Sequence, residues 1–214
     1  MFLRVFRTRF AAKGSSTLDA AHRVLYVTEG DLRLATPAQH ACLATGSAWY
    51  GRVPVACTAG DTTTSILCWE LSADSATASI DPGHERTLLL EQALSIDSPQ
   101  AHLIRLDRVS FPLGGVAYTH THQGPGIRVL LTGQITVEVN AERHVVRPGE
   151  AWFEAGPDPV LALASESELT SFARVMVLPI ALRGRSSIRY VNPEDLEKPK
   201  RQSYQIYIDT ALES

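Results

Sequence analysis

Apolar residues in this chain come in short runs that alternate with polar positions, and glycine or proline interrupts these runs at close intervals. The runs at 25–34 and 128–137 each carry a glycine near the middle, Gly30 and Gly133. A period of two is typical of strands, and a glycine between two such runs is typical of a tight turn. No window sustains the 3.6-residue period of an amphipathic helix. The pattern therefore predicts an all-β protein built from short strands.

The chain also contains an internal repeat, which a single displacement of the sequence against itself reveals. The matched pairs are Gly30 with Gly133, Gly46 with Gly149, Ala48 with Ala151 and Trp49 with Trp152. Each half continues from its glycine turn into an aromatic strand and ends with another apolar run, at 66–71 or 172–178. Two similar halves of closely spaced strands predict two tandem barrels or sandwiches.

We expect the two halves to span residues 1–75 and 90–182, with a linker at 76–89. The stretch 72–85 is rich in Ala, Ser and Asp and contains a Pro-Gly pair, which is typical of a linker. Residues 183–214 are expected to form a tail. It opens a short helical turn at Asn192, where proline follows at the first helical position, and continues into a strand at 204–208. Such a strand covers a sheet edge in its own chain or in a neighbour's.

Size and charge narrow the class of partner. With 214 residues, 44% of them hydrophobic, the chain can bury a core in each half. The formal net charge is −3, and the 20 Lys and Arg are scattered among 23 Asp and Glu, so we expect neither nucleic acid nor a membrane surface as a partner. No segment approaches the roughly 18 unbroken apolar residues of a membrane helix. A small molecule is the partner we expect.

The three cysteines, Cys42, Cys57 and Cys68, are odd in number and lack a Cys-x-x-Cys spacing. They encode neither a disulfide framework nor a thiolate zinc site, and we interpret them as small core residues. The arginine-containing stretch at 1–10 is interpreted as a first strand rather than a transit peptide. Together these features favour a cytoplasmic protein.

Two histidines, His120 and His122, stand one residue apart in a strand pattern. Alternation places both imidazoles on the same face of the strand. Two imidazoles on a rigid strand are half of a site for Fe, Mn, Ni, Cu or Zn, and such a site needs one or two further ligands.

The stretch from Gly114 to Gly133, with the two histidines at their spacing, resembles the first signature of the cupin superfamily: Gly, five residues, His-x-His, three or four residues, Glu, six residues, Gly. With the repeat, the chain resembles a bicupin, two tandem cupin-type jelly-roll β-barrels with few short helices. The resemblance implies a divalent metal in the C-terminal barrel. The chain departs from it at two ligand positions, since Gly126 stands where the family has Glu and Val160 where it has a third His.

The N-terminal half serves as an internal control for what the fold alone requires. Four positions are polar in the C-terminal half and differ in the other: His120 matches Thr17, His122 matches Asp19, Arg128 matches Leu25 and Glu154 matches Gly51. Alternation from the histidines also points Arg128 into the barrel, where an unpaired charge is costly. We expect Glu154 either to complete a two-His-one-carboxylate metal site or to neutralise Arg128.

Two functions remain open from the sequence. In the first, His120, His122 and Glu154 hold the metal of an oxygenase, isomerase or decarboxylase that acts on a small organic acid. Arg128 would bind its carboxylate, and Trp152 and Tyr118 are further candidate substrate contacts, although core packing also explains Trp152. In the second, the chain is a metal-free small-molecule-binding or regulatory bicupin without catalytic activity. An exposed barrel edge and the strand-like tail favour a homodimer in either case.

Overall fold

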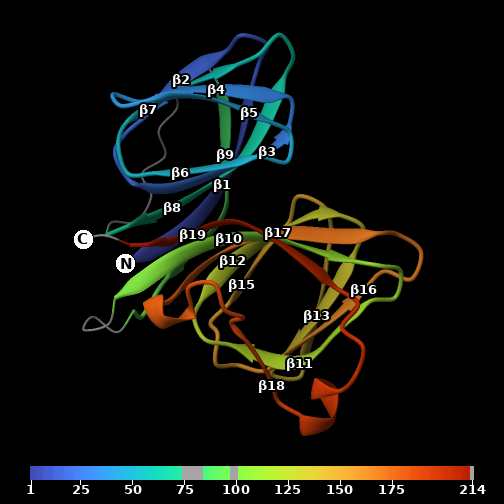
Figure 1. Ribbon diagram of the computed structural model, residues 1–214. Helices are drawn as coiled ribbons and strands as arrows, with labels where there is room; N and C mark the ends of the chain where they lie inside the picture. The colour runs from blue at the N-terminus through green and yellow to red at the C-terminus, as the bar shows by residue number, and fades with distance from the viewer. Residues whose placement is uncertain (74–83, 97–100, 213–214) are drawn as a thin grey trace. The chain divides into compact units, whose positions relative to one another are not determined.

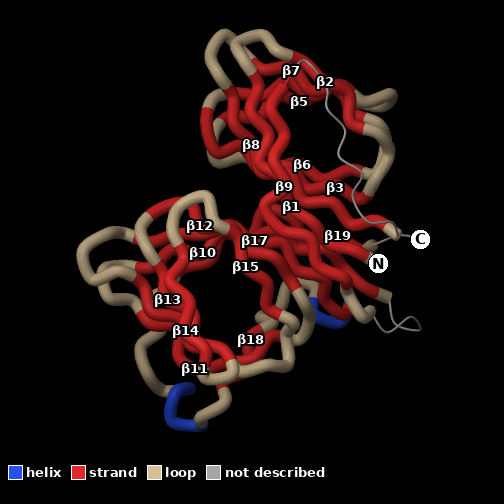
Figure 2. The backbone as a smooth tube through the Cα atoms, turned by 180° about the vertical axis from the view of Figure 1, so that it is seen from behind, coloured by secondary structure: helices blue, strands red, loops and turns tan. Residues whose placement is uncertain are grey.

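The structure is a computed structural model that describes residues 1–73, 84–96 and 101–212. Antiparallel strands make up nearly all of its regular structure, and within these ranges two short 3-10 turns are the helical segments (Figure 2). The predicted all-β fold with few short helices is confirmed. No helix in the described part of the chain is long and apolar enough to cross a membrane.

The N-terminal unit, Met1–Ile96, is built from two sheets. A five-stranded sheet has the order β6-β3-β8-β1-β9, and a four-stranded sheet has the order β2-β7-β4-β5. The strands are β1 (Phe2–Phe10), β2 (Ser15–Leu18), β3 (His22–Glu29), β4 (Asp31–Ala35), β5 (His40–Ala44), β6 (Ala48–Gly51), β7 (Val55–Ala59), β8 (Thr64–Ser72) and β9 (His84–Ala93).

The C-terminal unit, Asp97–Ser214, also contains two sheets, ordered β15-β12-β17-β10-β19 and β14-β13-β16-β11-β18. Figure 1 shows these two sheets facing each other across the interior of the unit. The strands are β10 (His102–Phe111), β11 (Val116–His122), β12 (Gly126–Thr132), β13 (Ile135–Val139), β14 (Glu142–Val146), β15 (Ala151–Glu154), β16 (Val160–Ala164), β17 (Thr170–Pro179), β18 (Ile188–Tyr190) and β19 (Ser203–Ala211).

The large sheets of the two units have the same strand order, so the predicted duplication is confirmed as two jelly-roll barrels. The glycines that anchor the repeat lie in equivalent hairpins, with φ of +75° at Gly30 and +71° at Gly133. A Cβ atom would lie 2.6 Å from a backbone oxygen at Gly30 and 2.5 Å from the Thr170 hydroxyl at Gly133. Only glycine combines this positive φ with this close approach, and for that reason both halves place it there.

The boundary between the units differs from the predicted one. Residues 84–89, expected in the linker, form the first part of β9, which pairs antiparallel with β1 from Phe10↔His84 to Phe2↔Ala93. Strand β9 therefore closes an edge of the N-terminal sheet, and the first unit extends to Ile96. The rest of the predicted linker, residues 76–83, lies outside the described residues.

The predicted tail is an integral part of the C-terminal unit. It contains η2 (Pro193–Leu196), where the sequence predicts a turn, although the Asn192 side chain donates a hydrogen bond to Asp195 at 3.2 Å instead of capping the turn. A second 3-10 turn, η1 (Ile180–Leu182), directly follows β17. Strand β19 pairs with β10, so the terminal strand covers an edge of its own sheet. The homodimer stays a prediction.

The two barrels bury different interiors. In the N-terminal barrel, Phe10, Leu25 and Ile66 are fully buried in an apolar core that also contains Phe6, Trp49 and Cys68. In the C-terminal barrel the apolar core contains Leu130 and Ile135, but the cross-strand pair equivalent to Phe6 and Cys68 is Asp107 and Arg174. Each large apolar side chain stabilises its barrel by roughly 1.5–3 kcal/mol. The C-terminal barrel therefore gives up apolar stabilisation at the end where its polar residues lie.

Candidate functional site

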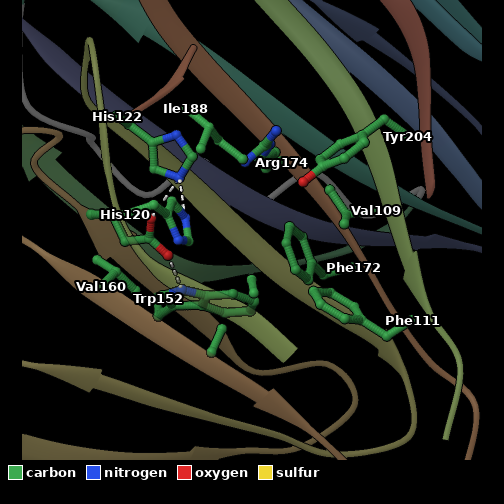
Figure 3. Close-up of a pocket in the computed structure, with 13 residues that line it drawn as sticks. Val109, Phe111, His120, His122, Trp152, Val160, Phe172, Arg174, Ile188 and Tyr204 are labelled. Atoms are coloured by element: carbon green, nitrogen blue, oxygen red, sulfur yellow. Dashed lines mark hydrogen bonds and ion pairs between the residues drawn. The ribbon is translucent and has the colours of Figure 1, made fainter. Parts of the chain in front are cut away.

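The two histidines lie on β11, which pairs with β16 on one side and with β18 on the other. Both side chains are buried, with 5% of His120 and 4% of His122 exposed. Their Nε2 atoms are 3.2 Å apart, and the rings meet edge to face at a centroid distance of 4.8 Å (Figure 3). The prediction that both imidazoles point into the barrel agrees with this geometry.

The neighbours of each ring determine where its proton lies. His120 Nδ1 is 2.7 Å from the carbonyl oxygen of Tyr118, which only accepts hydrogen bonds, so Nδ1 carries the hydrogen and Nε2 keeps its lone pair. His122 Nε2 is 3.2 Å from a carboxylate oxygen of Glu154, so in the neutral ring this nitrogen is the donor. His122 Nδ1 then accepts from the Ser187 hydroxyl at 3.4 Å. Both imidazoles are thus oriented in defined neutral forms.

Burial keeps both rings uncharged. It lowers the pKa of His122 to about 3, an effect that the hydrogen bond to Glu154 offsets only in part. Burial also lowers the pKa of His120, against a smaller opposing effect of the Tyr118 carbonyl. At neutral pH the pair therefore contributes hydrogen-bonding groups and no net charge.

Arg128 and Glu154 form a buried ion pair on the neighbouring strands β12 and β15. The Nη2 atom of Arg128 lies 2.6 Å from Oε2 of Glu154, and Nη1 donates to the Gly126 carbonyl at 2.6 Å. The first contact is an ion pair without the alignment of a hydrogen bond, so its attraction is mainly Coulombic. Arg128 is fully buried, and burial lowers its pKa only to about 10, so it stays charged at neutral pH. The sequence leaves two roles open for Glu154, and in the structure its carboxylate lies against Arg128, as the neutralising role requires.

The second oxygen of Glu154 is also engaged. The indole Nε1 of Trp152 donates to Oε1 at 2.9 Å. Burial by itself raises the pKa of Glu154, but the charge of Arg128 and the hydrogen bonds from His122 and Trp152 outweigh it and hold the pKa well below its usual range. The carboxylate is ionised, and each of its oxygens already has a partner.

A second buried ion pair, which the sequence analysis did not identify, lies beside the first. Arg174 on β17 contacts Asp107 on β10 through two nitrogens, at 2.6 and 3.0 Å. The guanidinium lies 5.7 Å from the ring centre of Tyr204 on β19. The sequence held a signal for Arg174, which is the one charged residue of β17, but not for Asp107, which lies among Arg105 and Arg108 on β10.

These side chains surround a pocket inside the C-terminal barrel. Its walls are mainly apolar or aromatic, and the residues that line it are Val109, Phe111, Ala117, His120, His122, Trp152, Glu154, Val160, Ala162, Phe172, Arg174, Ile188 and Tyr204. Figure 3 shows the imidazoles and Trp152 on one side, and Phe111, Phe172 and Tyr204 on the other. Trp152 and Phe172 meet edge to face with centroids 5.2 Å apart. An apolar cavity with a few convergent polar groups is the usual form of a small-molecule site. Here the cavity volume is about 20 Å³, so a ligand larger than a water molecule requires the walls to move.

Three sequence candidates lie around the pocket in different ways. Trp152 lines it, whereas Arg128 lies behind Glu154 and does not contribute to the walls. Tyr118 does not line it either, because a bulge between Ala117 and His120 shifts the alternation of β11. Its ring lies 4.9 Å from the Lys198 ammonium, and its backbone carbonyl is what reaches the site.

The tail supplies part of the site, which the sequence analysis did not anticipate. Strand β18 places Ile188 opposite His122 and Tyr190 opposite His120. Ile188 and Tyr204 line the pocket, and Ser187 is the hydrogen-bond partner of His122. The segment after residue 182 thus closes the C-terminal barrel over the histidines.

No protein family model matches this chain, and no curated protein matches its sequence. Solved structures do match. Oxalate decarboxylase from Bacillus subtilis aligns with a TM-score of 0.65 at 10% identity, covering 94% of this chain and 79% of the other. Vicilin from hazelnut, Corylus avellana, aligns with a TM-score of 0.56 at 11% identity, covering 82% and 74%.

A third matching structure is named for the cupin fold. It is a cupin 2 conserved barrel domain protein from Leptotrichia buccalis, with a TM-score of 0.50 at 15% identity, covering 83% of this chain and 88% of the other. This chain has the cupin fold. It occurs once in each unit, and the large sheets of the two units have the same strand order. At these identities the likeness extends to the cupin fold and not to the activity of any one match.

The cupin metal site can be tested against the residues that occupy it here. Among the described residues, no group of three or more His, Cys, Asp or Glu side chains is arranged to hold a metal ion. Val160 lines the pocket at the position of the third cupin histidine and pairs with His120 across the sheet. At Gly126 a Cβ atom would lie 2.5 Å from the Val175 carbonyl oxygen, so the backbone there has no room for a glutamate.

Glu154, the remaining carboxylate of the site, does not replace the missing metal ligands. Glu154 has one oxygen on the guanidinium of Arg128 and the other on the indole of Trp152. A divalent ion beside Glu154 would face the buried positive charge of Arg128 in a medium of low polarity. The donor set of this cupin barrel therefore does not fit a divalent metal.

Proposed function

We propose that the C-terminal barrel binds a small organic molecule without a metal, as a small-molecule-binding or regulatory cupin. The observation that carries this proposal is the Arg128–Glu154 ion pair, because it occupies the carboxylate that a metal would require. Around it, the pocket offers apolar and aromatic walls and two neutral imidazoles, which are suited to hydrogen bonding.

The charges around the pocket indicate an uncharged ligand rather than the carboxylate expected from the sequence. Arg128 is matched by Glu154, and Arg174 is matched by Asp107, each at 2.6 Å. A ligand carboxylate would have to displace one of these buried carboxylates. The desolvation penalty of burying the ligand charge would then exceed the Coulombic energy gained. A neutral molecule with one donor group could instead meet the lone pair of His120 Nε2.

The metal-dependent enzyme of the sequence analysis stays a second candidate on one observation. The Nε2 atoms of the two histidines are 3.2 Å apart. Two imidazoles bound to one zinc ion at about 2.0–2.1 Å stand at a similar separation. The missing third ligand and the buried guanidinium make this candidate the weaker one.

The experiment that tests the proposal uses the two repeat-related tryptophans as a matched pair. Trp152 lines the pocket, while Trp49 occupies the equivalent position in the core of the N-terminal barrel. Phenol, benzyl alcohol, benzamide and benzoate are titrated into 15N-labelled protein, and the indole N–H signals are followed. We expect a neutral fragment to shift the Trp152 signal saturably, with the Trp49 signal unchanged and benzoate weaker.

A filled-pocket variant provides the control. Ala162 lines the pocket and is 7% exposed, so Ala162→Phe places a ring inside it. The shift at Trp152 should be lost in this variant while the fold persists by circular dichroism. If no fragment shifts Trp152, or if the shift survives Ala162→Phe, the pocket is not a ligand site and the proposal fails.

A further inference from the structure

We propose that Arg128 is the resident cation of this barrel: its guanidinium keeps divalent ions out, and its removal converts His120, His122 and Glu154 into a metal site. This inference rests on the metal-independent function proposed above. It goes further in assigning to one residue the reason why a cupin with a His-x-His pair does without a metal.

The spacing of the three side chains supports the proposal. His122 Nε2 is 3.2 Å from His120 Nε2 and 3.2 Å from Glu154 Oε2. Ligands of one first-row ion at about 2.0–2.2 Å have their donor atoms roughly this far apart. Two of the three donor pairs therefore lie near the separation that ligands of one ion require, although the three groups are not arranged as a metal site while Arg128 lies against Glu154.

The charge balance shows what would have to change. With both imidazoles neutral, Glu154 carries the one negative charge of the trio, and Arg128 already neutralises it at 2.6 Å. The guanidinium is fully buried and held at its other nitrogen by the Gly126 carbonyl, so it has a fixed place beside the carboxylate. An entering divalent ion would meet it with strong repulsion.

Gly126 and Arg128 act together in this arrangement. The backbone at Gly126 lies so close to Val175 that no side chain fits, and its carbonyl oxygen is the acceptor for Arg128. The position that the cupin signature gives to a ligand glutamate is thus part of the support for the guanidinium. In the N-terminal barrel Leu25 stands at the arginine position and Gly51 at the glutamate position, so neither member of the pair is present without the other.

The test is a gain of metal binding on removal of the charge. Arg128→Gln removes the positive charge but keeps an amide that can donate to Glu154. Wild type and variant are purified with chelator, dialysed and titrated with Co²⁺, whose visible d–d absorption reports inner-sphere ligands, and Zn²⁺ competition follows. We expect Arg128→Gln to bind one Co²⁺ at least about 100-fold more tightly than wild type, because a buried like charge has been removed.

Two matched variants identify the ligands. The gained absorption should be lost in Arg128→Gln/His120→Ala and in Arg128→Gln/Glu154→Gln, while surface binding common to all variants is subtracted. Arg128→Met carries the same test if the glutamine variant does not fold, and refolding of either variant only with Co²⁺ counts as binding.

The proposal is overturned if wild type binds Co²⁺ as tightly as the variants through the same histidine. It is also overturned if neither Arg128→Gln nor Arg128→Met binds the ion. In the second case, the Trp152 fragment titration separates the two proposals, since fragment binding by wild type would leave the proposed function intact while the role of Arg128 fails.

Discussion

The two barrels share a strand order but differ at one end of their interiors. Where β1 and β8 bring Phe6 opposite Cys68, the equivalent strands β10 and β17 bring Asp107 opposite Arg174. Leu25 is likewise replaced by Arg128 in the second barrel. The N-terminal barrel also buries charges, in the cluster of Arg23, Glu70 and Arg86, but at these particular positions it uses apolar side chains. The fold itself therefore does not require Asp107, Arg174 and Arg128 to be charged.

The repeat-related tryptophans, Trp49 and Trp152, have different hydrogen bonding because one neighbouring residue differs. A Cβ atom at Gly51 would lie 2.2 Å from the Trp49 ring, so that indole covers the glycine and fills the space. Its buried Nε1 has no hydrogen-bond partner among the described residues. In the second barrel Glu154 takes the place of the glycine, and the Trp152 indole donates to it. The same aromatic residue is core in one barrel and part of a polar network in the other.

The largest effect should come from breaking the buried ion pair. Glu154→Gln leaves the Arg128 charge buried without a counterion, and we expect the free energy of unfolding to fall by about 3–5 kcal/mol. Adding Arg128→Leu, the residue of the N-terminal barrel, should recover much of this loss because the uncompensated charge is gone. Urea unfolding of the single and double variants measures both values, and a double variant less stable than Glu154→Gln would contradict the coupling.

Acid should affect the C-terminal barrel first. The pKa of His122 is about 3 in the folded protein against an ordinary 6.5, so the unfolded chain takes up the proton first. Stability present above pH 6.5 is therefore lost as the pH falls toward 3, by up to about 1.4 kcal/mol per pH unit, and His120 adds to it in the same direction. The window from pH 6.5 to 5 reports the histidines, because carboxylates titrate below it.

Hydrogen exchange followed separately on peptides of each barrel between pH 7 and 5 checks this. The N-terminal barrel has Leu18 opposite Val55 where the C-terminal barrel has His120 opposite Val160, so it lacks the buried histidine pair. Burial also lowers the pKa of His22 in this barrel, so it should change in the same direction but less. His122→Asn should flatten the pH dependence of the C-terminal barrel, and a slope that survives this substitution would place its origin elsewhere.

The smallest expected effect is the difference in the free energy of unfolding between the two tryptophan variants. Trp152→Phe removes a hydrogen bond to an ionised carboxylate, whereas Trp49→Phe removes an indole nitrogen that has no partner. We expect Trp152→Phe to cost about 1.5 kcal/mol more than Trp49→Phe, the usual contribution of a hydrogen bond to a charged group. Equal losses in urea unfolding would show that the indole–carboxylate bond adds nothing to stability.

The repeat made much of the fold and part of the site predictable. Gly30 and Gly133 mark equivalent hairpins because the positive φ there requires glycine in both halves. The same alignment singled out Arg128 and Glu154, because a charge in place of Leu25 or Gly51 has no role in the scaffold. The structure brings these two residues together at 2.6 Å.

Three features of the structure could not be predicted from the sequence. A bulge in β11 turns the Tyr118 ring away from the pocket, and alternation alone does not reveal a bulge. The first part of β9, residues 84–89, was expected in the linker because it adjoins the stretch rich in Ala, Ser and Asp, and strand pairing with β1 overrides that composition. The Arg174–Asp107 pair joins strands far apart in the sequence, so only the folded sheet shows that the two charges meet.

The edge strands β9 and β19 complete the large sheets of the two units in the same way. Both pair with the first long strand of their unit, and both place a carboxylate against an arginine there, Glu91 with Arg4 and Asp209 with Arg105. Each large sheet is therefore completed by the same fifth strand, pinned by the same kind of ion pair. The connection between β17 and β19 carries Ser187 and Ile188 to the histidines, so the second unit gains a wall of its pocket without any change in the order of that sheet.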